Sequence, residues 1–169
     1  MFKLQFQDEA GFGRINTPKY CWTGGQRPAV PCHHIMEYWY IYGAVDPCSA
    51  EECFLIAPQY NTACINTFLD MLSKQYSQEH ILLICDGAAW HKSGVLVVPD
   101  NIHLFHIPPY TPEIKPIEQI WREIRPRSFR KEIFKTLNDG TDRLTETIKS
   151  ITPDVIRSIT GRDQILKLL

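Results

Sequence analysis

The sequence feature that most constrains this chain is a proline-rich stretch at residues 107–121, which reads IPPYTPEIKPIEQIW. Proline fixes φ and has no backbone N–H, so this stretch suits neither the centre of a sheet nor a helix interior. Its last proline, Pro116, suits the first turn of a helix. We therefore expect a stiff connector that leaves a strand and places one acid, Glu118, at a helix start.

Several strands are predicted before this connector. Apolar and polar residues alternate from Phe2 to Asp8, a period typical of a half-buried strand. Asp8 falls on the apolar side of that strand, which is an unusual place for an acid. Aromatic and β-branched residues predict further strands at residues 34–45 and 52–57, with a short one at 20–23. Together these strands fit an antiparallel meander.

Two almost unbroken apolar runs follow, at residues 80–85 and 101–107, and the first ends in Asp86. Runs of this kind are typical of parallel strands buried on both faces. Helical spacing and caps predict four helices, at residues 61–76, 116–125, 142–151 and 152–159. We expect Asn61 or Thr62 to cap the first of them and Pro126 to end the second.

Composition limits the class of protein. The 169 residues are 44% hydrophobic and 22% charged, as in one ordinary globular domain. No apolar run approaches the ~20 residues of a membrane span, and no signal peptide is apparent. Six cysteines without a secretory signal favour reduced thiols in a cytosolic protein. A zinc site at residues 32–34 (Cys-His-His) is disfavoured, because adjacent ligands are not the usual spacing.

Charge is close to balanced overall, with a net charge of −1, which argues against a self-sufficient DNA binder. Residues 115–131 are an exception, since they hold six basic residues against two acids. This basic segment is either a solvated helix face or a patch that contacts phosphates. The charges alone leave both interpretations open.

Three acids stand at the ends of predicted elements: Asp8, Asp86 and Glu118. In open α/β sheets, sites form beyond the carboxyl ends of parallel strands. If the strands that lead to Asp8 and Asp86 are parallel neighbours, the two carboxylates come within reach of one metal ion. Oxygen ligands without sulfur favour Mg²⁺ or Mn²⁺. Such sites hold two ions ~4 Å apart and catalyse in-line attack at phosphorus.

Three blocks of the sequence resemble the catalytic blocks of DDE transposases, most closely the bacterial insertion-sequence branch of the mariner superfamily. They are QDEAGF at residues 7–12, LICDGAAWHKS at residues 83–93 and the proline-rich stretch itself. The spacing of 32 positions from Asp86 to Glu118 is similar to that of the family. The resemblance extends from Leu4 to about Arg125, which is most of the chain.

The resemblance implies an α/β, RNase H-like fold, with a mixed five-stranded sheet (three antiparallel strands, then two parallel) flanked by helices. It implies a catalytic domain at residues 1–130 and a C-terminal helical extension, 131–169, packed on it. Asp8, Asp86 and Glu118 would bind Mg²⁺ or Mn²⁺, with two ions expected. His91 would contact substrate or handle a proton. Activated water would attack first, and the freed 3′-hydroxyl would then attack target DNA.

The resemblance also implies partners. We expect DNA, as transposon ends and a TA-containing target, and a homodimer in the bacterial cytoplasm at the nucleoid, with no membrane association. Such transposases carry a helix-turn-helix region that reads the element's ends, whereas Met1 here opens almost directly on the first catalytic strand. We therefore expect the catalytic half alone: a truncated gene, a split reading frame with the helix-turn-helix region on another chain, or an expressed domain. Lys115 stands where the family pattern usually has asparagine. The expected DNA-contacting residues are Lys92, Lys115, Arg122, Arg125, Arg127, Arg130 and Lys131.

Three other functions stay open from the sequence. The chain could be a catalytically inactive remnant that binds DNA or protein, although all three acids are present. It could be another nuclease of the same architecture, such as a ribonuclease H or a junction resolvase. A glycosidase carboxylate pair is the most distant alternative, since that chemistry needs no third acid.

Overall fold

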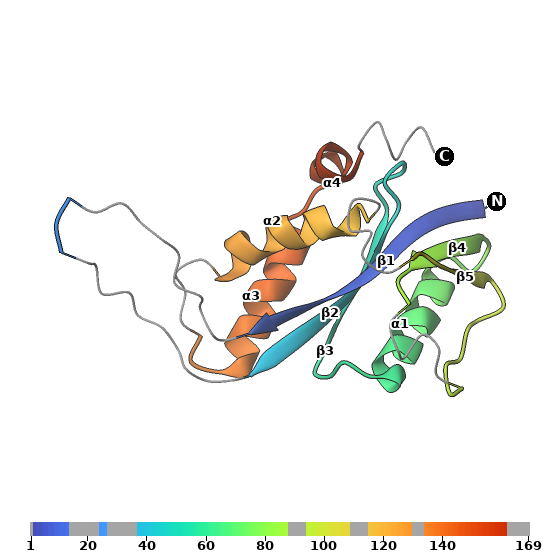
Figure 1. Cartoon of the computed structure of the whole chain (residues 1–169), viewed down its shortest axis with the longest axis horizontal. Helices are drawn as coiled ribbons and strands as arrows, with labels where there is room; N and C mark the ends of the chain where they lie inside the picture. Colours follow the sequence, from blue (N-terminus) through green and yellow to red (C-terminus); the bar gives the residue numbers. More distant parts are fainter. Residues whose placement is uncertain are drawn as a thin grey trace.

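A five-stranded mixed sheet forms the centre of the molecule (Figure 1). The computed structural model describes residues 2–13, 24–26, 37–87, 94–108, 115–129 and 134–161. The strand order is β3-β2-β1-β4-β5. The strands are β1 (Phe2–Gly13), β2 (Tyr38–Val45), β3 (Glu52–Ala57), β4 (His80–Cys85) and β5 (Ile102–His106). The first three pair antiparallel, whereas β4 pairs parallel with β1 and β5 parallel with β4, so the predicted sheet is confirmed.

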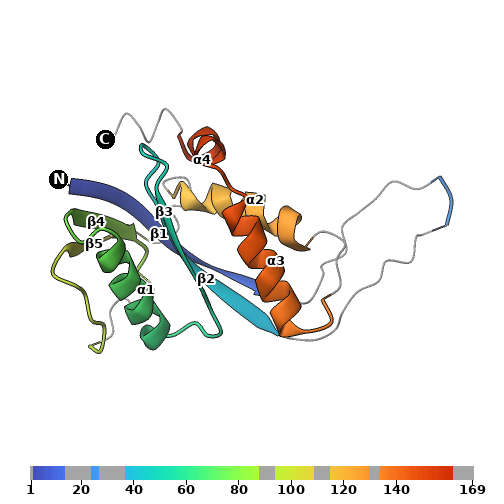
Figure 2. The ribbon, with the colours of Figure 1, turned by 180° about the vertical axis from the view of Figure 1, so that it is seen from behind.

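Helices pack on both faces of this sheet (Figures 1 and 2). They are α1 (Thr62–Gln75), α2 (Ile117–Phe129), α3 (Leu137–Lys149) and α4 (Pro153–Thr160). One core cluster joins α1 to one face of the sheet, and a second joins α2, α3 and α4 to the other face over β1 and β2. None of the described helices is long and apolar enough to span a bilayer.

The helix predicted after β3 forms as its sequence indicates. The Asn61 side chain accepts a hydrogen bond from the backbone N–H of Cys64 at 2.9 Å and so caps α1. The apolar residues at helical spacing are all buried: Ile65, Phe68, Leu69, Leu72 and Tyr76. Burial of this face, more than intrinsic propensity, stabilises the helix.

Two predicted ends are wrong. β1 does not end at Asp8 but continues to Gly13, because β2 goes on pairing with it as far as Gly13 opposite Tyr38. Helix α2 does not end at Pro126 but continues to Phe129. The proline removes one hydrogen bond, to the carbonyl of Arg122, on the exposed side of the helix where water can replace it.

Helix α3 begins at Leu137, well before the predicted start at residue 142. Thr136 and Asp139 form a reciprocal capping box that fixes this earlier start. Gly140 lies inside this helix although glycine is a weak helix former. In the structure Gly140 lies against the Trp39 ring, where an added Cβ would overlap the indole. A packing requirement therefore overrides the local propensity.

The expectation that β4 and β5 are buried on both faces is also wrong. Ile81 and Leu83 of β4 are buried in the cluster that includes α1. The other face carries Leu82 at 38% exposure and Phe105 at 55%. The helices on that side of the sheet pack over β1 and β2, and no described element covers this part of it.

Some predictions fall outside the described residues. These are the strand at 20–23, the Cys-His-His run at 32–34, the connector at 109–114, and His91, Lys92, Arg130 and Lys131. The predicted boundary at residue 130 also lies there and stays a prediction, although α3 and α4 share one core with α2 and the sheet. The four described cysteines are free thiols: Cys48, Cys53, Cys64 and Cys85.

Candidate active site

The register of the parallel strands brings two of the predicted acids together. The β1–β4 ladder pairs Phe6 with Ile84 as its last partners. Asp8 lies two residues after Phe6, and Asp86 lies two residues after Ile84. Because side chains alternate between faces with a period of two, both acids continue on the same face of the sheet. The two carboxylates therefore meet at the carboxyl edge of the parallel strands, where α/β proteins build their sites.

A lysine lies between these two acids. Lys115, two residues before α2, donates from Nζ to Asp8 Oδ1 at 2.9 Å and to Asp86 Oδ2 at 3.0 Å. Asp8 Oδ1 and Asp86 Oδ2 can therefore be no farther apart than these two hydrogen-bond lengths added together. The lysine side chain is only 10% exposed, and that of Asp8 only 12%. Lys115, predicted to contact DNA, thus bridges the two acids.

Trp121 of α2 holds the other oxygen of Asp8. Its Nε1 donates to Asp8 Oδ2 at 3.0 Å. The indole packs edge-on against Phe12 and Phe54, with ring centroids 6.4 and 5.8 Å away. Gly43, the antiparallel partner of Asp8, makes room for it, because an added Cβ would lie 2.7 Å from the Trp121 ring. The close approach of α2 to the sheet therefore positions the carboxylate.

Burial dominates the electrostatics of this cluster. It raises the pKa of Asp8 above its usual value, although the charge of Lys115 and the hydrogen bonds from Lys115 and Trp121 oppose the shift. Burial also works to lower the pKa of Lys115, but the carboxylates of Asp8 and Asp86 outweigh it and the pKa is raised. A carboxylate buried without a cation would be costly. This edge of the sheet therefore requires positive charge.

A tyrosine that the sequence did not single out lies on the other side of β1. The Tyr60 hydroxyl donates to Glu9 Oε2 at 3.3 Å, and its ring stacks on Tyr40 with centroids 5.4 Å apart. Burial raises the pKa of Tyr60, and the negative charges of Glu9, Asp8 and Asp86 raise it further. The charges of Glu9, Asp8 and Asp86 therefore all act on Tyr60, which is 39% exposed.

A histidine also accompanies Asp86, but it is not the predicted one. The ring Nδ1 of His106, on β5, lies 3.1 Å from the backbone oxygen of Asp86 and 3.3 Å from Cys85 Sγ. His91 lies outside the described residues, and its role stays a prediction. The sequence predicted only a buried strand at residues 101–107, where His106 lies, and did not single out this histidine.

Glu118 lies in the first turn of α2 and is partly buried. Its backbone N–H donates to the Lys115 carbonyl at 3.2 Å, so both residues belong to one turn. Within the described residues, no three His, Cys, Asp or Glu side chains lie close enough to hold a metal ion together. Glu118 as the third ligand therefore stays a prediction.

The paired carboxylates nonetheless fit a divalent cation. Two oxygens from different strands converge on one positively charged atom, Lys115 Nζ, in a largely buried place. Carboxylate oxygens without sulfur are the ligands that Mg²⁺ and Mn²⁺ prefer. This donor set agrees with the sequence-based expectation of a hard metal ion.

The basic residues of α2 have unequal freedom. Arg125 donates to the Gly11 carbonyl at 3.1 Å and lies 4.8 Å above the Phe12 ring. Arg127 donates from Nε to Glu123 at 2.7 Å. Arg122 is exposed, and its guanidinium has no hydrogen bond or ion pair within the described part of the chain. It is therefore the arginine of α2 best able to meet an external phosphate.

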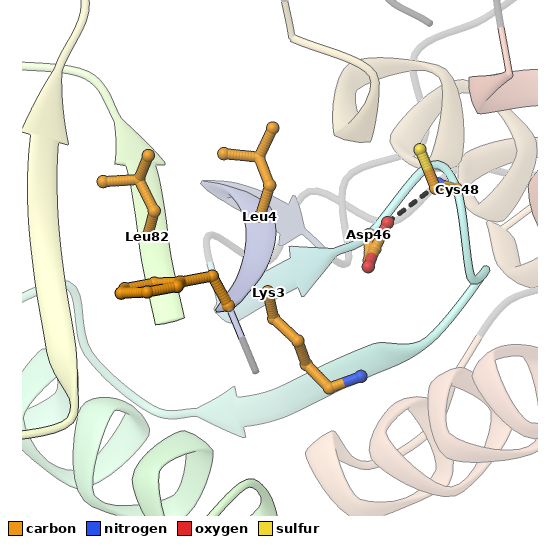
Figure 3. Close-up of a pocket in the computed structure, with 6 residues that line it drawn as sticks. Lys3, Leu4, Asp46, Cys48 and Leu82 are labelled. Carbon is orange, nitrogen blue, oxygen red and sulfur yellow. Dashed lines mark hydrogen bonds between the residues drawn. The ribbon is translucent and has the colours of Figure 1, made fainter. Parts of the chain in front are cut away.

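A hollow lies at the N-terminal end of β1, at the edge of the sheet where the parallel strands β1 and β4 begin (Figure 3). It is lined by Phe2, Lys3, Leu4, Asp46, Cys48 and Leu82. Its polar groups already have partners, since Lys3 pairs with Glu51 and Glu79, and Asp46 accepts from the backbone N–H of Cys48 at 2.8 Å. It is a weaker candidate than the carboxylate pair.

Sequence reasoning missed several contributors to the site. The role of Gly43 could have been inferred from the sequence, because a glycine inside a predicted strand often marks a close approach of another group. Trp121 is buried, as expected for a large apolar residue, but its hydrogen bond to Asp8 depends on tertiary packing. The position of Tyr60 follows from the path between β3 and α1, which no local pattern indicates.

Comparisons with known proteins give a matching family model and a similar protein. A family model described as "DDE superfamily endonuclease" matches residues 3–139. A protein of Sinorhizobium fredii, "Uncharacterized protein y4pE/y4sA", is 36% identical over 101 residues, which are 59% of this chain and 75% of that protein.

Two solved structures share the architecture. "Mos1 transposase paired-end complex with left transposon end" is similar with a TM-score of 0.69 at 13% identity, and "Crystal structure of the Mos1 mariner paired end complex with Mn" with 0.70 at 12%. Each match covers 98% of this chain, which spans about half of the Mos1 chains, 52% and 53%. At such low identity the likeness shows the fold, which is the predicted RNase H-like one.

Proposed function

The chain belongs to the family of DDE superfamily endonucleases, and from that membership we propose that it cleaves DNA strands at transposon ends and transfers them to target DNA. The observation that carries the proposal is the convergence of Asp8 and Asp86 at the carboxyl edge of β1 and β4. Both acids come from the blocks that resemble the catalytic blocks of the transposases.

The residues of the site have separate tasks in this proposal. Asp8 and Asp86, with Glu118 as the third acid, hold Mg²⁺ or Mn²⁺, with two ions expected. Bound divalent ions would stabilise negative charge on the reacting phosphate and lower the pKa of an attacking water. Trp121 fixes Asp8 through its Oδ2, so that the carboxylate keeps one orientation. His91 contacts the substrate or moves a proton.

In the cleavage step the oxygen of a water molecule forms a new bond to phosphorus and the P–O bond to the 3′-oxygen breaks, which leaves a 3′-hydroxyl on one strand end and a 5′-phosphate on the other. In the transfer step that hydroxyl forms a new P–O bond with target DNA and displaces another 3′-oxygen. Both steps are in-line displacements at phosphorus, which depend on positioning and charge stabilisation more than on covalent help from the protein.

The partners follow from the same proposal. One of the similar Mos1 structures is a complex with the left transposon end, which supports DNA as the partner of this chain. We propose a TA-containing target and a homodimer. The exposed arginines of α2 would contact phosphates, and a transposase of this kind would act at the nucleoid in the bacterial cytoplasm.

The test is nicking of supercoiled plasmid in the presence of Mn²⁺. The wild-type chain should nick, and Asp86→Ala should lose at least about a hundredfold in rate, or ~2.7 kcal/mol of transition-state stabilisation. Glu118→Gln should lose a similar factor if it is the third ligand. Asp70→Ala is a matched control, because Asp70 is an exposed acid of α1 that pairs with Lys74.

Other outcomes distinguish the alternatives. Equal nicking by the wild type and Asp86→Ala would assign the activity to a contaminant and reject the proposal. A chain that binds Mn²⁺ and DNA but cleaves neither strand would be an inactive remnant. Preferential cleavage of an RNA–DNA hybrid would indicate a ribonuclease H instead.

A further inference from the structure

Lys115 places a positive charge between the two acids that would bind metal. Its Nζ lies 2.9 Å from Asp8 Oδ1 and 3.0 Å from Asp86 Oδ2, and its side chain is 10% exposed. The remaining oxygen of Asp8 is bound by Trp121. Within the described residues, both hydrogen-bond partners of the ammonium are thus carboxylate oxygens, one from Asp8 in β1 and one from Asp86 directly after β4.

An ammonium and a divalent ion compete for such a place. Mg²⁺ binds carboxylate oxygens at about 2.0–2.1 Å, closer than an ammonium hydrogen bond, and it must lie within reach of the same two oxygens. Two cations a few ångströms apart in a buried site repel each other strongly. The lone pairs that face Lys115 Nζ are also those that a bridging ion would use. The two occupants therefore exclude each other.

We propose that Lys115 is a built-in competitor of the divalent metal ion: its ammonium holds Asp8 and Asp86 together in the metal-free site and has to withdraw for an ion to bridge them. This inference rests on the metal site of the proposed function. It assigns a task to the residue that stands where the family pattern usually has asparagine, which carries no charge.

The position of Lys115 links this exchange to Glu118. The Lys115 carbonyl accepts a hydrogen bond from the Glu118 backbone N–H at 3.2 Å, so both residues lie in the turn that opens α2. Two carboxylates more than balance one ammonium charge, whereas a divalent ion brings twice that charge. Replacement of the ammonium by the ion therefore favours the approach of a third acid, and Glu118 is one turn away.

The experiment measures Mn²⁺ affinity by isothermal titration calorimetry, without any activity assay. Lys115→Met keeps an unbranched side chain and removes the charge, and Lys115→Gln provides a polar alternative. Both variants should bind Mn²⁺ with a dissociation constant at least about tenfold lower than the wild type. Lys74→Met is the matched control, because Lys74 also pairs with an aspartate but lies on the exposed face of α1. It should leave the affinity unchanged.

A thermal-unfolding series adds a second readout. Without metal, Lys115→Met should melt below the wild type, since it leaves two carboxylates close together without a cation. Saturating Mn²⁺ should raise its melting temperature by more than it raises that of the wild type. Adding Asp86→Ala to Lys115→Met should abolish the tight binding, which locates the ion at this pair.

Two results would overturn the proposal in different ways. Equal or weaker Mn²⁺ binding by both folded Lys115 variants, with measurable binding by the wild type, rejects the competition and leaves the proposed function standing. An absence of Mn²⁺ binding in the wild type and in both variants rejects the metal site itself, and the proposed function fails with it.

Discussion

The two carboxylate oxygens of Asp8 are bound by different elements. Oδ1 accepts from Lys115, just before α2, and Oδ2 accepts from Trp121, within α2. The strand supplies the acid, and the helix fixes its rotation. A hydrogen bond to a charged, largely buried acceptor contributes more than an ordinary one, about 1.5–3 kcal/mol. Trp121 is thus both a core residue and a positioning residue for the site.

Trp121→Phe tests this double role. Phenylalanine keeps an aromatic ring in the core but removes the indole N–H. We expect a loss of about 1.5–3 kcal/mol in the free energy of unfolding, measured with urea, together with weaker Mn²⁺ binding. Part of that loss comes from the smaller ring, so a double-mutant cycle with Asp8→Asn is needed to isolate the hydrogen bond. A coupling free energy near zero would show that the indole contributes packing alone.

At the residue scale, the sequence predicts the identities of the acids better than their surroundings. Strand alternation, which the sequence displays, sets the face on which Asp8 and Asp86 lie, and the parallel register of β1 and β4, which the sequence left conditional, brings them together. Lys115 was predicted to contact DNA, and in the structure its ammonium pairs with the two acids. Basic residues close in sequence do not reveal which of them turns inward, because that depends on how the start of α2 approaches the sheet.

At the element scale, two glycines control how closely other groups pack. Gly43 in β2 lies under Trp121, and Gly140 in α3 lies against Trp39. Both lie inside regular elements although glycine weakens strands and helices. In the fold each one removes a side chain where a large indole must pack. Strand bounds were predicted well where apolar runs end in turns, and helix bounds less well where packing sets them.

Gly140→Ala should therefore destabilise the protein although alanine is the better helix former. The added methyl group would overlap the Trp39 ring, which is buried. Overpacking of this kind costs about 1–3 kcal/mol, more than the ~1 kcal/mol that alanine gains in helix propensity. Urea unfolding followed by circular dichroism measures the difference. Asn138→Ala, at an exposed position of the same helix, is the control and should cost little.

The opposite result would be informative as well. If Gly140→Ala is more stable than the wild type, α3 can move away from Trp39 without cost. The shared core of α2, α3 and β2 would then be less tightly packed than the structure indicates. Combining Gly140→Ala with Trp39→Phe should recover part of the lost stability if the clash is the cause.

At the scale of the whole molecule, charge is distributed so that a nearly neutral chain has one basic edge. The net charge is −1, yet α2 presents Arg122, Arg125 and Arg127. The structure separates these arginines, since Arg125 and Arg127 have partners within the protein. Arg122 follows Glu118 by four residues, which puts both on one side of the helix. A phosphate held by Arg122 would thus lie near the proposed catalytic acids.

Arg122→Ala should therefore weaken DNA binding in a way that salt reveals. Each phosphate contact contributes about 0.9 to the slope of log K against log salt concentration. Loss of Arg122 should reduce that slope by about 0.9 for every duplex sequence, because phosphate contacts carry no base information. Fluorescence anisotropy with a labelled duplex in metal-free buffer measures the slope without cleavage.

Arg127→Ala is the comparison, and its slope should change less, since Arg127 is already paired with Glu123. An unchanged slope for Arg122→Ala would remove this face of α2 from the DNA path, and the route of the strand to Asp8 and Asp86 would have to run over another edge of the sheet.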